Sequence, residues 1–300
     1  MNNVATGITD SVSFALASKV KDYFQLIKFT LSFTVVFCCV VCYLLAPNIQ
    51  FDFLSVLLLF LAGMLITGSA NAINQTVEKD TDALMKRTAG RPVASGRMDT
   101  NEAWIFAAVT GIAGVLLMWY YFNLLSAVLG LFSLFLYAFV YTPLKKINSI
   151  SVLVGAFPGA LPCLIGWVAG TGEIDAGGLV LFGIQFLWQF PHFWAIAWVA
   201  HKDYEKAGFK LLPGREGPTK FTALQSIIYS MLMIPVGMLP FYFRISGDIS
   251  LWILLACNLT MVYLSIRLFI KMNVQAARRV MFGSYFYLVI VFLSLLFDKV

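Results

Sequence analysis

The feature that most constrains this chain is its hydropathy, because long apolar stretches recur from one end to the other. Each stretch has about 20 mostly apolar residues, the length that an α-helix needs to cross a lipid bilayer. Charged residues make up only 12% of the 300 residues, against about 25% in soluble domains. The sequence predicts an all-α membrane protein, a bundle of nine transmembrane helices near residues 24–46, 52–77, 102–120, 124–142, 150–170, 176–200, 221–244, 249–271 and 279–297.

The basic residues are distributed unevenly between the two sides of this predicted bundle. If the N-terminus is cytoplasmic, all but two of the 21 Lys and Arg residues, Arg244 and Lys299, fall on the cytoplasmic side. Cytoplasmic connections of membrane proteins carry such an excess. We therefore expect a cytoplasmic N-terminus and an external C-terminus. The net charge of +6 follows from this topology, so it does not indicate a nucleic-acid partner.

The same pattern predicts one transmembrane domain over residues 1–300, with 1–23 as an N-terminal cytoplasmic segment. Two cytoplasmic connections, 78–101 and 201–220, are long and charged, and we expect them to form a cap over one cavity. The first residues lack Arg and include Asp10, so they look like neither a signal peptide nor a transit peptide. This favours a bacterial inner (cytoplasmic) membrane. The five cysteines lie in apolar stretches, where we expect buried thiols.

Three oxygen-bearing side chains follow one another at the end of the second apolar stretch. Asn74, Glu78 and Asp82 are each four residues apart, so on an α-helix they share one face. Carboxylate and amide oxygens suit Mg²⁺, and the basic residues just behind them suit phosphate. The alternative is a solvated loop with helix-pairing charges. Ionisable groups on one face at a membrane boundary favour a functional role.

A second polar face is predicted along the sixth stretch and the loop that follows it. Gln185, His192 and Asp203 are seven and then eleven residues apart, which places them within about 20° of one another on an unbroken helix. Pro191 is able to kink that helix. Such a face is typical of a helix that lines a substrate cavity. His192 has two equal interpretations, a neutral imidazole paired with a neighbouring helix or a contact to the substrate.

Three lysines near the same membrane boundary also have two interpretations each. Lys145 and Lys146 end the fourth stretch and either reach the polar site or serve as positive-inside anchors. Charge alone favours the interpretation as anchors. Lys28 lies just inside the first stretch and either extends to the interface or contacts phosphate.

Four motifs taken together resemble one known family. In chain order they are NQTVEKDTDALMKRTAGRP, YTPLKK, QFPHFWAIAW and KDYEKAGFKLLP. They resemble the UbiA superfamily of intramembrane prenyltransferases, and within it the branch that acts on haem. The resemblance implies transfer of a farnesyl group from farnesyl diphosphate to a vinyl group of haem B, with addition of water, to give haem O and diphosphate.

The resemblance also implies residue roles and partners. The sequence departs from the family pattern at two positions: Glu78, where aspartate is usual, and Ala207, where the wider family has a second acid. The missing second acid leaves the number of metal ions open. A partner in haem modification or oxidase assembly would take the product. The implied catalytic residues and Mg²⁺ ligands are Asn74, Glu78, Asp82 and Asp203, the diphosphate contacts are Arg87, Arg91, Lys145 and Lys202, and the acceptor contacts are His192, Gln185 and Tyr204.

Three other functions remain as alternatives. The first is a prenyltransferase of the same family that acts on an aromatic acid or a quinone precursor. The second is a secondary transporter, but transporters place ionisable groups near the membrane midplane, whereas here they gather at one rim. The third, a structural membrane subunit, leaves the column of Asn74, Glu78 and Asp82 without a purpose.

Overall fold

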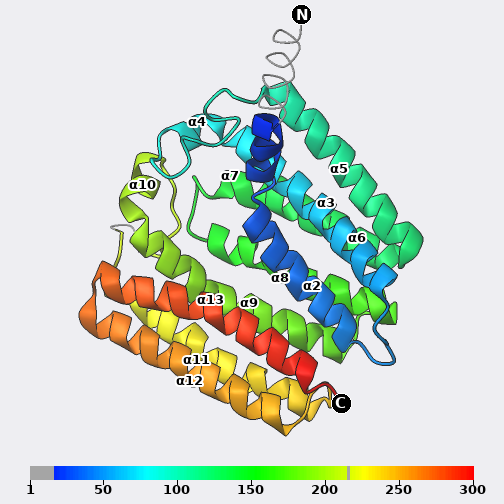
Figure 1. The fold of residues 1–300 in the computed structure, drawn as a ribbon. Coiled ribbons are helices and arrows are strands. Elements are labelled where there is room, and N and C mark those ends of the chain that lie inside the picture. Colours follow the sequence, from blue (N-terminus) through cyan, green and yellow to red (C-terminus); the bar gives the residue numbers. More distant parts are fainter. Residues whose placement is uncertain (1–16, 215–216) are drawn as a thin grey trace, which may run out of the picture.

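The computed structural model describes residues 17–214 and 217–300, and these fold as a bundle of helices (Figure 1). The only pairing of strand type in this part of the chain is an isolated bridge between Ser246 and Lys299. The long helices are α2 (Phe29–Leu45), α3 (Phe53–Val77), α5 (Thr100–Tyr121), α6 (Leu124–Phe135), α8 (Ser151–Thr171), α9 (Ala176–Val199), α11 (Lys220–Tyr242), α12 (Asp248–Lys271) and α13 (Val274–Phe297). The short elements are α4 (Lys79–Ala83), the π-helix η1 (Leu136–Tyr141), α7 (Thr142–Leu144) and α10 (His201–Lys206).

By length and composition, eight helices of the described chain are able to cross a membrane, with Leu124–Leu144 counted as one span. A ninth span arises if Ala17–Leu26 and Phe29–Leu45, which meet at 54°, are taken together. The nine predicted helices agree with this count. The first one differs from the prediction, because it is bent rather than straight. Lys28, at the bend, has a left-handed backbone with φ of 49°, which interrupts the regular helix.

Short polar side chains explain where many of the helices begin. Such side chains accept a hydrogen bond from a free backbone N–H of the first turn and so stabilise the helix end. The helices that begin in this way start within five residues of the positions predicted from hydropathy. Residues that cap in this way are Asp52, Asp99, Asn123, Asp175, Thr219 and Asn273.

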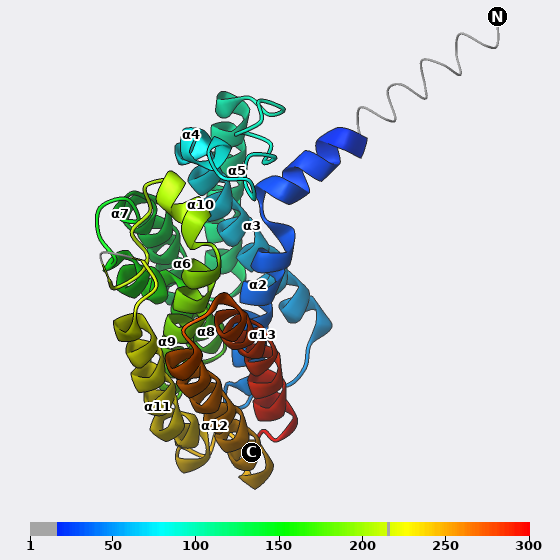
Figure 2. The same ribbon diagram turned by 90° about the vertical axis from the view of Figure 1, so that its left-hand side faces the viewer.

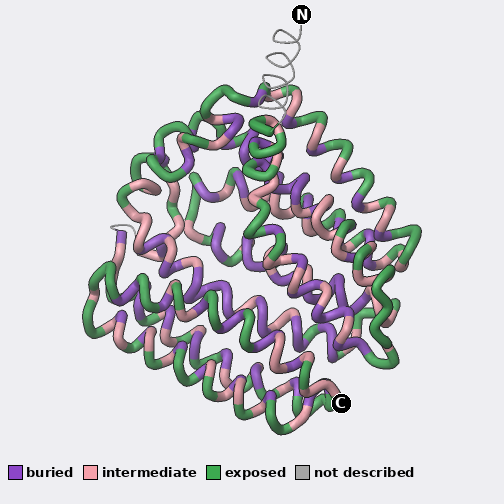
Figure 3. Tube along the Cα trace, in the orientation of Figure 1, coloured by how far each residue is buried: buried purple, intermediate pink, exposed green. Residues whose placement is uncertain are grey.

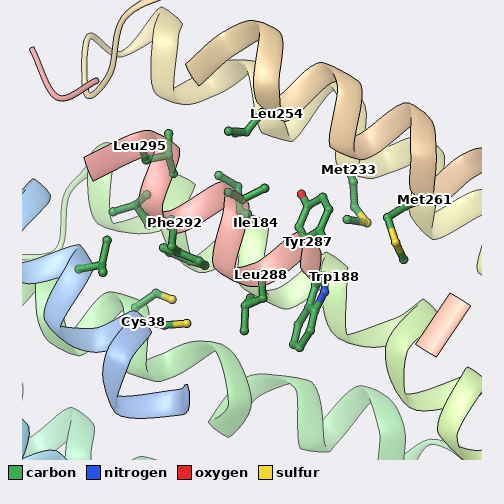
Figure 4. Packing of buried hydrophobic residues seen from close by; sticks show 14 of the residues in the cluster. Cys38, Ile184, Trp188, Met233, Leu254, Met261, Tyr287, Leu288, Phe292 and Leu295 are labelled. Atoms are coloured by element: carbon green, nitrogen blue, oxygen red, sulfur yellow. The ribbon is translucent and has the colours of Figure 1, made fainter. Parts of the chain in front are cut away.

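Three clusters of buried hydrophobic residues lie inside the described part of the bundle, two large ones and a small one between α8, α9 and Leu212. Of the two large clusters, one is surrounded by α2, α3, α5, α6 and α8, and the other mainly by α9, α11, α12 and α13. Figure 3 shows the buried residues on the helix sides that face one another. Figure 4 shows part of the second large cluster, where Ile184 and Trp188 of α9 meet Leu288 and Phe292 of α13. The helices α2, α8, α9 and α13 contact one another and join the two large clusters.

The outer surface carries many large apolar side chains, as a lipid-facing surface requires. The cysteines agree with the prediction, since four of the five are buried and all five are free thiols. The short helices α4, α7 and α10 gather at one end of the bundle, and the C-terminus lies at the other end (Figures 1 and 2). The two long charged connections therefore lie on the same side, as the basic residues predicted.

Candidate functional site

The predicted column of Asn74, Glu78 and Asp82 is present at the end where the short helices gather. Helix α3 ends at Val77, but backbone hydrogen bonds from Glu78 to Asn74 (3.0 Å) and from Asp82 to Glu78 (2.7 Å) keep the four-residue spacing across the junction with α4. The three residues are buried, with exposures of 1%, 4% and 0%. Asp80 on the same short helix is exposed. The interpretation as a solvated loop is therefore wrong for this column.

Each residue of the column is in contact with a different basic side chain. Two of the bases, Lys28 and Lys145, come from distant parts of the chain, whereas Arg91 lies in the same connection as Asp82. At Glu78 the contact is a close ion pair without the alignment of a good hydrogen bond. The contacts are Lys28 Nζ to Asn74 Oδ1 at 2.7 Å, Lys145 Nζ to Glu78 Oε1 at 2.5 Å, and an Arg91 guanidinium nitrogen to Asp82 Oδ2 at 2.6 Å.

Lys28 is a site residue that the sequence left undecided. The bend between the two parts of the first span directs its side chain inward, to Asn74, rather than to the membrane interface. The signal was a lysine inside an apolar stretch, but the bend that decides its direction has no clear mark in the sequence.

Lys145 contacts both the second long connection and Glu78 of the column. Its backbone carbonyl accepts a hydrogen bond from Lys210 of the second connection (2.7 Å), and its ammonium group lies 5.1 Å from the ring centre of Phe209. The side chain is buried, which lowers the pKa of Lys145, with Glu78 opposing this effect. Lys145 is thus no surface anchor, whereas its neighbour Lys146 is exposed.

The donor atoms of the column fit a hard divalent cation. Asp82 Oδ1 is buried and has no hydrogen-bond partner, and such an orphaned carboxylate oxygen is costly unless a ligand or cation satisfies it. Glu78 Oε2 accepts a hydrogen bond from the Asn74 amide at 2.9 Å. Within residues 17–214 and 217–300, no group of three His, Cys, Asp or Glu side chains is already arranged around one ion position. In this arrangement Glu78, Asp82 and Asp203 do not surround a common ion position.

The predicted diphosphate contacts are only partly brought together. Arg91 and Lys145 lie at the column. Arg87 is exposed and donates to the Tyr204 hydroxyl at 3.3 Å, so it connects the first long connection with α10. Burial raises the pKa of Tyr204, while Arg87 and Arg91 lower it. Lys202 is exposed on α10, away from these contacts.

Of the three residues predicted to share one helix face, two lie on α9 and the third lies on α10. Helix α9 continues through Pro191 and carries Gln185 and His192, both buried. It ends at Val199, and Asp203 lies on α10 beyond the break at Ala200. Gln185 Oε1 is buried without a partner. His192 Nδ1 lies 2.7 Å from Ser284 Oγ on α13, as expected for an imidazole paired with a neighbouring helix.

A cleft of about 720 Å³ opens beside the column, between the 147–149 connection and the second long connection. Its walls include His201, Tyr204, Phe209 and Lys210, but none of the column residues. Two of these wall residues contact the basic side chains, Tyr204 with Arg87 and Phe209 with Lys145. The cleft thus adjoins the charged cluster without containing it.

Residues 35–295 match the UbiA prenyltransferase family. The chain belongs to this family. The fold and the family that the four motifs indicated are therefore confirmed. Two relatives of this UbiA member are the protoheme IX farnesyltransferases of Cytophaga hutchinsonii, 46% identical over 95% of this chain and 100% of the relative, and of Rickettsia bellii, 37% identical over 100% of both chains.

Solved structures of UbiA proteins share the fold. A digeranylgeranylglyceryl phosphate synthase superposes with a TM-score of 0.78 at 22% identity, covering 94% of this chain and 98% of the other. A UbiA homologue from Archaeoglobus fulgidus, bound to GPP and Mg²⁺, gives a TM-score of 0.66 at 14% identity, covering 91% and 99%. At these identities the likeness concerns the fold alone.

Proposed function

We propose that this UbiA member transfers the farnesyl group of farnesyl diphosphate to a vinyl group of haem B, with addition of water, and so forms haem O and diphosphate. The observation that carries the diphosphate part is the buried column, in which three oxygen-bearing residues lie against three bases. Haem as the acceptor is supported by the name of the relatives, protoheme IX farnesyltransferase, which match this chain along their full lengths.

The basic side chains bind the diphosphate and stabilise the charge that grows on it as it leaves. Arg91, Lys145 and Lys28 are within reach of the column, and we assign Arg87 and Lys202 to the rim. Asn74, Glu78, Asp82 and Asp203 would hold Mg²⁺, whose charge makes diphosphate a better leaving group. The orphaned Asp82 Oδ1 supports this assignment.

The reaction breaks the bond between C1 of the farnesyl chain and the diphosphate oxygen, and the electron pair leaves with diphosphate. The terminal vinyl carbon of haem then bonds to C1. Water adds to the cationic carbon next to the porphyrin and loses a proton, which gives the hydroxyl. Aromatic rings stabilise a passing allylic cation, and Tyr141 and Phe209 lie beside Lys145. Burial of the column protects the cation from early capture by water.

We assign the acceptor side to Gln185, His192 and Tyr204. The first two lie on α9, which leads from the apolar interior towards α10, and Tyr204 touches Arg87 at the rim. The proposed location is a bacterial inner membrane, where both substrates dissolve in the bilayer. The product would pass to an enzyme that modifies haem further or to oxidase assembly.

The test uses the purified protein in lipid vesicles with haem B, farnesyl diphosphate and Mg²⁺. Pigments are extracted and weighed by mass spectrometry, with and without a chelator. We expect a haem heavier by one farnesyl group plus water, lost with the chelator. Unchanged haem in folded protein, together with diphosphate release in the presence of an aromatic acid or a quinone precursor, would instead establish the alternative acceptor.

A further inference from the structure

The hydrogen bonds around His192 decide which of its ring nitrogens carries the proton. Ser284 Oγ lies 2.7 Å from His192 Nδ1 and donates its own hydrogen to the Met281 carbonyl at 2.6 Å. A hydroxyl has only one hydrogen to donate. Ser284 must therefore accept from His192, so Nδ1 bears the hydrogen and Nε2 keeps a lone pair.

The same surroundings fix the orientation of the ring. Trp188, one helical turn earlier on α9, stacks on the imidazole with ring centres 4.5 Å apart. The Trp188 indole N–H donates to the Ser284 carbonyl at 2.8 Å, so Ser284 holds both rings. Tyr285 meets the imidazole edge-on at 5.2 Å. An imidazole held on three sides has little freedom to turn.

His192 Nε2 has no hydrogen-bond partner within residues 17–214 and 217–300, and the residue keeps 7% of its surface accessible. A histidine that only tied α9 to α13 would need Nδ1 alone. Histidines that bind a metal typically donate the other ring N–H to a fixed partner, which sets the tautomer and the ring direction. The arrangement of Ser284 and His192 has this form.

The position of His192 also suits an acceptor next to the diphosphate site. It lies seven residues before the end of α9 at Val199, or roughly 10 Å along the helix. Beyond that end, Tyr204 of α10 contacts Arg87 of the first long connection. His192 therefore lies on the helix that leads to the rim contact between Tyr204 and Arg87.

We propose that Nε2 of His192 is the axial ligand of the iron of the haem acceptor, and that Ser284 is a positioning residue that fixes its tautomer. The inference rests on the proposed function for the identity of the acceptor. Coordination uses the Nε2 lone pair and releases no proton, because the hydrogen is on Nδ1. The iron contact holds the porphyrin in place while its vinyl group reacts.

The test is haem binding, which needs no turnover. The full-length protein in vesicles is titrated with haem B, and resonance Raman spectra of the ferrous complex are recorded for the iron–histidine stretching band. We expect the band in the wild type and its loss in His192→Ala. Free imidazole should restore an iron–imidazole band in that variant. The chain has one other histidine, so His201→Ala is the matched control and should keep the band.

Ser284→Ala tests the positioning role separately. We expect the iron–histidine band to shift and haem affinity to fall by about 10-fold or more, the usual cost of removing such a partner. Ser294→Ala is its control, because Ser294 also donates to a carbonyl three residues earlier on α13 but lies away from His192. It should change neither the band nor the affinity.

The outcomes separate this inference from the proposed function. An unchanged band in His192→Ala, or loss of the band in His201→Ala, would overturn the ligand assignment even if farnesylated haem is formed. If the band depends on His192 but the protein never farnesylates haem, the assignment of His192 as the iron ligand would be supported and the proposed farnesyl transfer would be refuted.

Discussion

Lys145, the residue after the fourth span, and Glu78, the residue after the second, form an ion pair of 2.5 Å in which both side chains are almost fully buried. Neither charge has much water to solvate it, so each depends on the other. The pair also links the 78–101 connection, which begins at Glu78, to the 201–220 connection, because the Lys145 carbonyl accepts a hydrogen bond from the Lys210 backbone N–H.

Lys145→Met should lower the free energy of unfolding by about 3–5 kcal/mol, because it leaves a buried carboxylate without a counter-charge. The double variant Glu78→Gln/Lys145→Met should recover most of that loss and remain inactive, because both side chains belong to the proposed site. Denaturant titration in mixed micelles gives the free energies. Lys146→Met, at the exposed neighbour, should change stability by less than about 0.5 kcal/mol. Equal losses at the two lysines would contradict the burial of this pair.

Gly166 of α8 allows a close approach to α2. A Cβ built on Gly166 would overlap the backbone carbonyl oxygen of Cys39, which cannot move aside without shifting α2. We expect Gly166→Ala to destabilise the protein by about 1–3 kcal/mol or more. Gly183→Ala is the matched control, since its nearest neighbour is a Val236 methyl group at 3.4 Å. Thermal unfolding should give a lower melting temperature for Gly166→Ala than for Gly183→Ala. Similar melting temperatures would show that α8 and α2 do not pack closely at Gly166.

Lys299 explains one of the two exceptions to the cytoplasmic bias of basic residues. Its ammonium group donates to the carbonyls of Leu44 and Ala46 at 2.7 Å each, and so caps the end of α2. Lys299→Met should cost about 1.5–3 kcal/mol of stability, as expected for hydrogen bonds to a charged group. Turnover at low temperature should persist, because this end lies opposite the site. Lys271→Met, at an exposed lysine that ends α12, is the control, and an equal loss there would refute the capping role.

The sequence predicted what depends on local periodicity. The four-residue spacing of Asn74, Glu78 and Asp82 located the column, and the apolar stretches located the helices. Contacts between segments that are distant in the sequence could not be predicted from this periodicity. The partnership of His192 with Ser284 depends on how α9 packs against α13, and the contact of Lys28 with Asn74 depends on a bend in the first span. The break at Ala200, which separates Asp203 from the α9 face, has no proline or glycine to mark it.

We expect the buried carboxylate of Asp82 to be essential for farnesyl transfer to haem. Asp82→Asn removes the charge and keeps the shape, whereas Asp80→Asn changes an exposed carboxylate on the same short helix. We would measure haem binding and the farnesylated haem product of both variants side by side in vesicles. We expect Asp82→Asn to bind haem normally and make no product, while Asp80→Asn stays active. An Asp82→Asn enzyme that turns over at the wild-type rate would contradict this expectation.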